Sequence, residues 1–335
     1  MKSPRGFAAL LLLSGLTACS SLISTNGSSA AAPEPEWSQI STANQPTARH
    51  EAAFTRVGDR AYLLGGRGIK PVDILDPASR SWTQGPASPV EIHHFQPVVV
   101  ASEIYLLGAM TGGWPGEDPL PNVYIYDTEQ HSWRTGAEIP AERRRGGAGA
   151  VYHEGSIYLV CGIIDGHRGG HVAWLDRYEL ATGTWTRLPD APRARDHFQA
   201  VVRDGKIYAA AGRRTTATPD MFTHTETAVD VYDIAAGTWT TLADTLPTPR
   251  AGNAAAVVDG EILIAGGESG AHELAHSEVE ALNPLTGTWR SLPPLSRGRH
   301  GTGLVQFKDE LYMAAGCGKR GGEPELDDLI GATIE

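Results

Sequence analysis

The chain has 335 residues, of which 41 % are hydrophobic and 20 % are charged, and its formal net charge is −11. A chain of this size and composition can bury a substantial core, while its acidic balance argues against nucleic-acid binding, which needs a basic surface. Three cysteines are too few for a disulfide-stabilised scaffold, so we expect packing to hold the fold together.

The first residues have the features of an export signal. Lys2 and Arg5 precede the apolar run FAALLLLSGL, which is too short to span a membrane as a stable helix, and small residues then lead to Cys19 in LTAC. LTAC resembles the bacterial lipobox, and this resemblance implies removal of residues 1–18 and acylation of Cys19. A signal cut at another site is the alternative. We expect an exported protein that is anchored at the periplasmic face of the outer membrane. Anchoring to the inner membrane and exposure at the cell surface are the alternatives.

Residues 19–36 contain the sequence SSLISTNGSSAAAPEPE, whose Ser, Ala and Pro content is typical of a flexible tether. No later stretch is long and apolar enough to span a membrane, so we expect membrane contact only through Cys19.

From residue 37 onward the sequence repeats about every 50 residues. Before each later tryptophan comes a β-rich run with a turn, such as VDVYDIAAGTW, and before that an apolar run that stops on small residues, such as AYLLGG. Another apolar run and a tight polar turn precede these, so each unit supplies four short strands. The tryptophans that set the period are Trp37, Trp82, Trp133, Trp185, Trp239 and Trp289.

Four antiparallel strands cannot bury their apolar faces alone, so such units pack radially as the blades of a propeller. The first segment, WSQI, is only a fourth strand, and the last, 299–335, contains only three. The two ends therefore complete one blade, which removes an open sheet edge. The sequence predicts an all-β, six-bladed β-propeller over residues 37–335, closed by the N-terminal strand, and we expect a monomer.

The pattern of small residues after the second strand, a tyrosine or acid in the third and a tryptophan opening the fourth resembles the kelch repeat. The resemblance covers residues 37–335, although four of the six units lack the paired glycines. It implies a kelch β-propeller, and six-bladed kelch proteins include sialate mutarotases that are exported to the periplasm.

One face of the predicted propeller carries the long loops, such as AMTGGWPGEDPLPN and RRTTATPDMFTHTETA, while the other has short turns such as VDGE. Ten of the twelve histidines map to the long-loop face. Long ordered loops on a rigid scaffold usually carry binding sites, so we predict that this face is the functional one.

Five arginines occupy the same position before the innermost strand of five blades. They either form a funnel for a carboxylate or phosphate, or brace the ring through nearby carboxylates, and we expect one or two to face a ligand. The predicted ligand-binding residues are Arg49, His94, Trp114, Arg145, Arg195, His197, Arg250, Asn253, Arg299 and His300.

Two of these candidates stand in near-copies of one sequence. His94 in IHHFQPVVV and His197 in RDHFQAVV occupy equivalent positions at the pore rim, either as site residues or as structural histidines. Trp114 has no counterpart in other repeats and is either a stacking platform for a sugar ring or an anchor for its loop.

Metal and redox chemistry receive little support from the sequence. HELAH at 272–276 matches the zinc protease motif but falls in a loop without a helix, so His272 and His276 are only weak metal candidates. All ten tyrosines are explained by the repeat, which argues against the copper oxidases found among kelch proteins. Cys161 and Cys317 fall in opposite blades, too far apart for a disulfide. We expect no cofactor.

The leading functional prediction is binding of a small polar or sugar-like ligand, or of a glycan-bearing partner, on the long-loop face. The first alternative is a sugar-acid mutarotase of the sialate type, for which the candidate catalytic residues are His94, His197, Glu268 and Arg250. The second is a protein-interaction scaffold. The sequence does not decide whether the protein is an enzyme.

Overall fold

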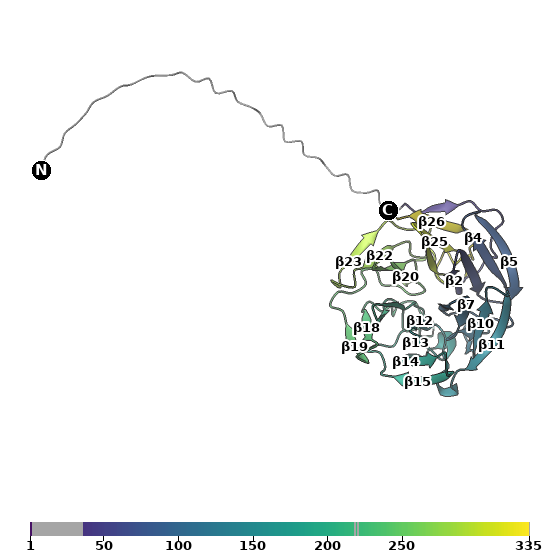
Figure 1. The fold of residues 1–335 in the computed structure, drawn as a ribbon, viewed down its shortest axis with the longest axis horizontal. Helices are drawn as coiled ribbons and strands as arrows, with labels where there is room; N and C mark the ends of the chain where they lie inside the picture. Colours follow the sequence, from purple (N-terminus) through teal and green to yellow (C-terminus); the bar gives the residue numbers. More distant parts are fainter. Residues whose placement is uncertain (2–35, 218, 220, 335) are drawn as a thin grey trace, which may run out of the picture. The chain divides into compact units, whose positions relative to one another are not determined.

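The computed structural model describes residues 1, 36–217, 219 and 221–334. The predicted cleavage site, Cys19 and nearly all of the tether lie outside the described residues. From residue 36 onward the chain forms six four-stranded antiparallel sheets arranged as a ring (Figure 1).

Each sheet is one blade, with its strands ordered from the pore outward. Blade 1 is β2 (Ala52–Val57), β3 (Arg60–Gly65), β4 (Pro71–Asp76) and β5 (Ser81–Ala87). Blade 2 is β6 (Pro97–Val100), β7 (Glu103–Leu106), β10 (Asn122–Asp127) and β11 (Ser132–Glu138). Blade 3 is β12 (Gly149–His153), β13 (Ser156–Ile163), β14 (His171–Glu179) and β15 (Thr184–Leu188).

The remaining blades follow the same order. Blade 4 is β16 (Val201–Arg203), β17 (Lys206–Ala209), β18 (Asp230–Asp233) and β19 (Thr238–Thr241). Blade 5 is β20 (Ala254–Val258), β21 (Glu261–Ala265), β22 (Val279–Leu282) and β23 (Trp289–Leu292). Blade 6 is β24 (Leu304–Phe307), β25 (Glu310–Ala314), β26 (Leu329–Thr333) and β1 (Ser38–Ile40).

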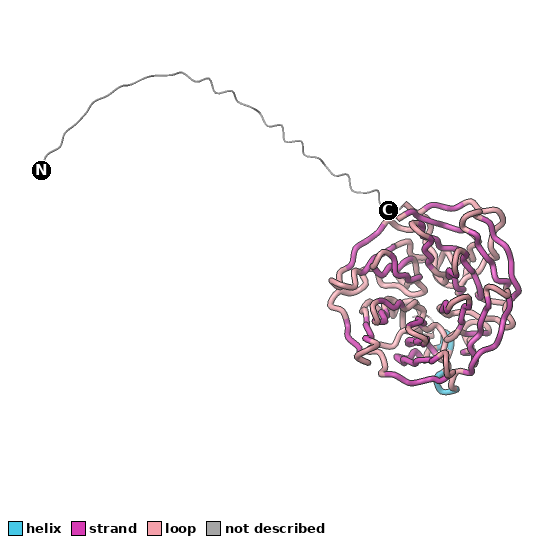
Figure 2. The backbone as a smooth tube through the Cα atoms, viewed as in Figure 1, coloured by secondary structure: helices cyan, strands magenta, loops and turns pink. Residues whose placement is uncertain are grey.

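The ring closes as predicted. β1 pairs with β26 in the register Ser38↔Gly331 and Ile40↔Leu329, so the start of the propeller supplies the outermost strand of its last blade. Each innermost strand contacts the innermost strands of both neighbouring blades. Figure 2 shows the resulting circle of strands.

Apolar side chains pack between adjacent blades, and the repeated tryptophans contribute at these junctions. Trp82 is buried with Phe54 and Leu329, which come from blades 1 and 6. The indole N–H of Trp239 donates to the carbonyl of Pro189 at 2.8 Å, linking blade 4 to the end of blade 3. The tryptophans therefore act as wedges between blades, which fits their amphipathic rings.

The long loops contain the only other regular elements in the described part of the chain. A two-stranded ribbon, β8 (Met110–Thr111) and β9 (Asp118–Pro119), flanks Trp114. Two single-turn 3-10 helices, η1 (Ala141–Arg143) and η2 (Gly166–Arg168), lie in the loops before β12 and β14. No helix among the described residues is both long and apolar enough to cross a membrane.

Candidate functional site

The pore is bounded by a ring of backbone hydrogen bonds that joins all six blades. One residue of each blade takes part, and in five of the six junctions its N–H donates to the carbonyl of the equivalent residue in the preceding blade, at 2.6–3.0 Å. The sixth junction is closed by the N–H of Ala52, 3.1 Å from the carbonyl of Gly301. We call the six residues of this ring the collar: Glu51, His94, Gly147, His197, Gly252 and Gly301.

Every collar residue has a left-handed backbone, with φ between 52° and 66°. Glycine adopts this conformation freely, whereas a residue with a Cβ pays about 1–2 kcal/mol. Three blades use glycine, while the other three carry Glu51, His94 and His197. These three side chains are thus held at the pore at a cost in stability that the glycine blades avoid, and such strain is commonly retained where function requires it.

The five arginines two residues before the collar are buried braces. All are 0 % exposed, and their guanidiniums donate to carbonyls at the end of the second strand of their own blade and to a carboxylate in or just before the third strand. Burial of a guanidinium is tolerated only when its donors are paired, and these are largely paired. The pairs are Arg49–Asp73, Arg145–Asp176, Arg195–Asp230, Arg250–Glu280 and Arg299–Asp328.

None of the five arginines lines either of the two cavities along the pore. The structure therefore corrects the expectation that one or two of them face a ligand, because their donors point into the blades. The same correction removes Arg250 from the candidate catalytic residues, since it is enclosed by Glu280 and the carbonyls of Thr248, Ile264 and Gly266.

Blade 2 lacks both the bracing arginine and its carboxylate partner. It has Ile92 at the arginine position. It also has Tyr124 at the position that Asp73 occupies in blade 1. The two residues correspond because each lies two residues before the third-strand residue that pairs with the tryptophan of its blade. Ile92 and Tyr124 share one apolar cluster. Both charges are absent together, as expected for a structural pair.

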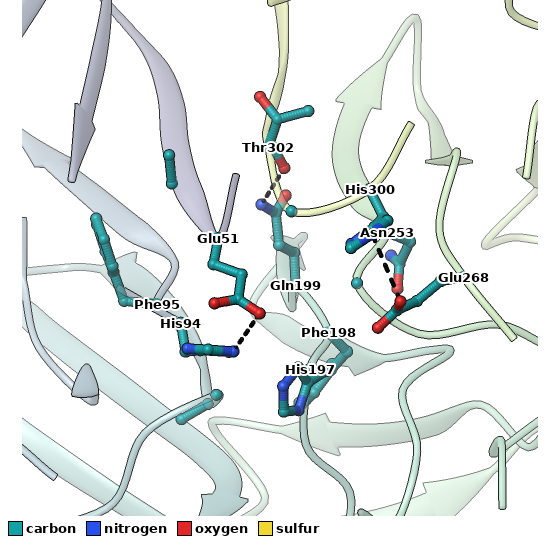
Figure 3. A pocket seen from close by; sticks show the side chains of 15 residues that line it. Glu51, His94, Phe95, His197, Phe198, Gln199, Asn253, Glu268, His300 and Thr302 are labelled. Atoms are coloured by element: carbon teal, nitrogen blue, oxygen red, sulfur yellow. Dashed lines mark hydrogen bonds and ion pairs between the residues drawn. The ribbon is translucent and has the colours of Figure 1, made fainter. Parts of the chain in front are cut away.

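Three imidazoles meet at the pore. His94 and His197 come from the collar, and His167 comes from η2 in the long loop of blade 3. Their ring centres lie 4.8–5.0 Å apart, with interplanar angles of 62–80°. Glu51 joins them, with its Oε1 2.6 Å from Nε2 of His94 (Figure 3).

Each of these imidazoles is held through its Nδ1. That of His167 lies 2.9 Å from Oε1 of Glu117, that of His197 lies 2.5 Å from Oδ1 of Asp196, and that of His94 lies 2.6 Å from Nδ1 of His93. Burial lowers the pKa of His94 well below its usual value of 6.5, and burial also lowers the pKa of His197. Both rings are therefore neutral at pH 7.

Another polar group faces them across the pore. Glu268 is 3 % exposed, accepts hydrogen bonds from Arg213 and from the N–H of Gly321, and lies 3.4 Å from Nε2 of His300. Burial alone would raise the pKa of Glu268, but its electrostatic interactions with His300 and Arg213 outweigh burial and lower the pKa to about 2. A carboxylate with so low a pKa is a weak general base at neutral pH.

Two adjoining cavities follow the pore axis. The inner one has a volume of about 50 Å³ and is lined by collar residues together with Asn253, Glu268 and His300 (Figure 3). The outer one has a volume of about 880 Å³ and lies among the long loops, sharing Glu51 and Glu268 with the inner one. The inner cavity has room for an ion or a few waters. A sugar-sized ligand would have to occupy the outer cavity.

The predicted site residues other than the five arginines divide between these cavities. His94, His197, Asn253 and His300 line the inner one, and Asn253 is 2 % exposed, with no hydrogen-bond partner for its Oδ1 among the described residues. Trp114 lines the outer cavity and is 56 % exposed, an arrangement that leaves its indole available for stacking.

The outer cavity also contains residues that the sequence predictions missed. Arg67 contacts both Glu51 and Glu117, and Arg213 contacts Glu268. Phe222 adds a second aromatic ring to the wall. These residues lie in loops that differ from blade to blade, so the repeat gives no signal for them.

The two histidines of HELAH form a separate group with Glu278 in the loop before β22. We call this group the rim cluster: His272, His276 and Glu278. One ligand atom from each lies within 4.8 Å of the others. The chain from 268 to 278 contains no helix, as the sequence predicts, so the arrangement of a zinc protease is absent. Cys161 and Cys317 are both buried and unpaired.

Comparison with known proteins agrees with this architecture. The family model described as "KLHDC2/KLHL20/DRC7 Kelch-repeats domain" matches residues 98–316. Kelch-like protein terF of Aspergillus terreus is 27 % identical over 293 residues, which is 80 % of this chain and 61 % of that protein. Alpha-scruin of Limulus polyphemus is 27 % identical over 219 residues, 62 % of this chain and 23 % of that protein.

This chain thus spans about three fifths of terF and less than a quarter of alpha-scruin. A solved structure titled "Structure of YjhT" superimposes with a TM-score of 0.72 at 16 % identity, covering 86 % of this chain and 96 % of that one. At this identity the superposition supports the fold alone. The match to the family model covers more than half of the chain, and the protein belongs to the kelch-repeat β-propeller family.

Proposed function

We propose that the protein is an exported, lipid-anchored kelch propeller that binds a small polar, sugar-like ligand, free or on a glycan-bearing partner, in its outer cavity. The observation that carries the proposal is the composition of that cavity. It combines a volume of about 880 Å³ with two aromatic side chains, Trp114 and Phe222, and several charged groups. Sugar recognition uses this combination, because pyranose faces stack on aromatic rings while hydroxyls bond to charged and amide groups.

The charges of the cavity favour a neutral polyhydroxy ligand over a sugar acid. Four glutamates line the wall against two arginines, and both arginines already contact carboxylates. An incoming carboxylate would have to displace one of these internal partners. Hydroxyl groups can instead bond to the carboxylates as they stand.

The test is ligand binding by the wild-type chain and two single variants. A carbohydrate array followed by calorimetry identifies the ligand, and Trp114→Ala should weaken its binding about 2- to 12-fold, the equivalent of about 0.5–1.5 kcal/mol for an aromatic contact. Tyr152→Ala is the control, because Tyr152 is an exposed aromatic residue at the short-turn end of β12 and should leave affinity unchanged. Equal losses in both variants, or no loss in Trp114→Ala, would reject the outer cavity as the site.

A sugar mutarotase remains the second candidate, and the buried imidazole–carboxylate pairs at the pore favour it. His197 beside Asp196 and His94 beside Glu51 adjoin the cavity where a sugar would sit. Such an enzyme would accelerate anomer exchange in a proton NMR measurement, and His197→Ala would abolish the acceleration. An interaction scaffold, in contrast, would yield crosslinked partners without binding sugars or exchanging anomers.

Export and lipidation are a separate part of the proposal. They rest on the sequence of residues 1–19. Metabolic labelling with a fatty acid should mark the wild-type chain in the membrane fraction, whereas Cys19→Ser should remain unlabelled. Labelling of both chains, or of neither, would contradict lipidation at Cys19.

A further inference from the structure

Four potential metal ligands converge where the inner and outer cavities adjoin. Glu51, His94, His167 and His197 each offer one ligand atom, and these atoms all lie within 4.8 Å of one another. We call this set the pore cluster. Three imidazole nitrogens and one carboxylate oxygen make a donor set suited to divalent transition metals such as zinc.

The contacts of His93 and His94 leave Nε2 of His94 available for a cation. A chain of three contacts runs from the carbonyl of Gly112 through His93 and His94 to Glu51, with distances of 3.1, 2.6 and 2.6 Å. Only the first two contacts are hydrogen bonds, because Nε2 of His94 has no hydrogen-bond partner among the described residues although the carboxylate of Glu51 lies beside it. A cation between this imidazole nitrogen and the carboxylate oxygen would bind both atoms.

His197 points to the same requirement independently. It is 8 % exposed, its Nδ1 contacts Asp196, and its Nε2 has no hydrogen-bond partner among the described residues. Buried polar atoms in native proteins are nearly always paired, so an unpaired imidazole nitrogen beside two other imidazoles calls for an explanation. A metal ion in the pore cluster would satisfy it.

Carboxylates behind the ligands complete the arrangement. Glu117 and Asp196 contact Nδ1 of His167 and His197, which fixes these rings with Nε2 as the free atom. Metal-binding histidines are characteristically held in this way. The carboxylates of Glu51, Glu117 and Asp196 carry three negative charges, and Arg67, which contacts two of them, carries one positive charge. The balance of −2 is neutralised by one divalent ion.

From these observations we propose that the pore cluster binds one divalent transition-metal ion of the zinc type. In a tetrahedral site with metal–nitrogen bonds of about 2.0–2.1 Å, neighbouring donors lie about 3.3–3.4 Å apart. Binding would therefore move the Glu51 oxygen slightly away from Nε2 of His94, which it approaches to 2.6 Å, and draw together those donors that lie up to 4.8 Å apart. The proposal concerns the pore cluster alone and does not depend on the identity of the ligand in the outer cavity.

The collar itself provides a clean variant for the test. Glycine already occupies the collar position in three blades, so His197→Gly removes a ligand without imposing backbone strain. The experiment uses the untagged full-length chain, stripped with a chelator and titrated with Zn²⁺ against a chromophoric competitor, with bound metal counted by mass spectrometry. We expect one Zn²⁺ per wild-type chain and an affinity at least 100-fold lower in His197→Gly.

The matched control lies in the rim cluster. His276→Ala should bind one Zn²⁺ as tightly as the wild type does. Cobalt substitution adds a spectroscopic readout, because Co²⁺ held by nitrogen and oxygen in a tetrahedral site absorbs far more strongly than the hydrated ion. No stoichiometric Zn²⁺ on the wild type, unchanged binding by folded His197→Gly, or loss of binding in His276→Ala would each overturn the proposal.

Discussion

The pore cluster and the rim cluster contain the same kinds of residues at the same spacing, yet they differ in what their nitrogens do. In both, one ligand atom per residue lies within 4.8 Å of the others. In the rim cluster, His276 uses Nδ1 on Glu278 and Nε2 on Ser269, so both ring nitrogens are occupied. In the pore cluster, His197 keeps Nε2 unpaired.

This difference follows from where the two clusters stand in the fold. His94 and His197 are fixed by the collar, where six blades constrain the backbone in a conformation unfavourable to them. His272 is exposed in a loop, with its Nδ1 close to the carbonyl of Leu274 in the same loop. Proximity of histidines is therefore a weak indication of a metal site, and unsatisfied nitrogens held by a rigid scaffold are a stronger one.

The largest expected effect is the loss of stability on removing an arginine that braces a blade next to the pore cluster. Arg49→Ala leaves Asp73 buried without its guanidinium, and removal of one partner from a buried ion pair costs about 3–5 kcal/mol. Urea unfolding followed by tryptophan fluorescence measures this loss. At the rim, Lys319→Ala breaks the exposed contact with Glu273 and should leave the unfolding midpoint unchanged. Equal effects of the two variants would contradict the bracing role.

A smaller effect should appear as stabilisation by the metal. Zn²⁺ at 100 times its dissociation constant should raise the free energy of unfolding by about 2.7 kcal/mol, because the ion binds the folded chain. Chelator titration during thermal unfolding would reveal the shift. His94→Gly should abolish it, and His276→Ala should retain it. A shift that survives in folded His94→Gly would place the ion elsewhere.

The residues behind the ligands should tune affinity without contacting the ion. Asp196→Asn and Glu117→Gln should each weaken Zn²⁺ binding about 10- to 100-fold, as is typical when the partner of a metal-bound histidine is altered. Glu278→Gln, the corresponding change at the rim, should have no effect. If all three variants bound equally well, the carboxylates would have only a structural role.

The smallest expected effect concerns the two thiols. Burial raises the pKa of Cys161 and of Cys317 to about 11, and both are 0 % exposed. Neither should react with iodoacetamide at pH 8 in the folded protein, and Cys317→Ser should leave Zn²⁺ binding unchanged. Rapid labelling of either peptide, detected by mass spectrometry, would show that the blades open more readily than the packing suggests.

Most of the fold was accessible from the sequence because it repeats. The spacing of Trp37 and its five counterparts predicts six blades, and the incomplete first and last units predict the closure that pairs β1 with β26. The sequence did not decide whether the arginines brace the blades or bind a ligand, because a guanidinium before an innermost strand can point either into the pore or into its blade. Only the positions of partners such as Glu280 decide it.

The candidate site was accessible only in part. Alignment of the six strand starts, RHE, IHH, RGG, RDH, RAG and RHG, would have shown glycine at the third position of three blades and Glu51, His94 and His197 in the others. Glu117 and His167 gave no such signal, because they belong to loops of two different blades that meet only in the folded protein.

The most direct test of the account is a crystal structure of the full chain with one equivalent of Zn²⁺, with anomalous diffraction recorded on both sides of the zinc absorption edge. We expect a single anomalous peak enclosed by Glu51, His94, His167 and His197, and none beside His272 and His276. A peak at the rim cluster instead, or ordered pore residues with no peak among them, would contradict it.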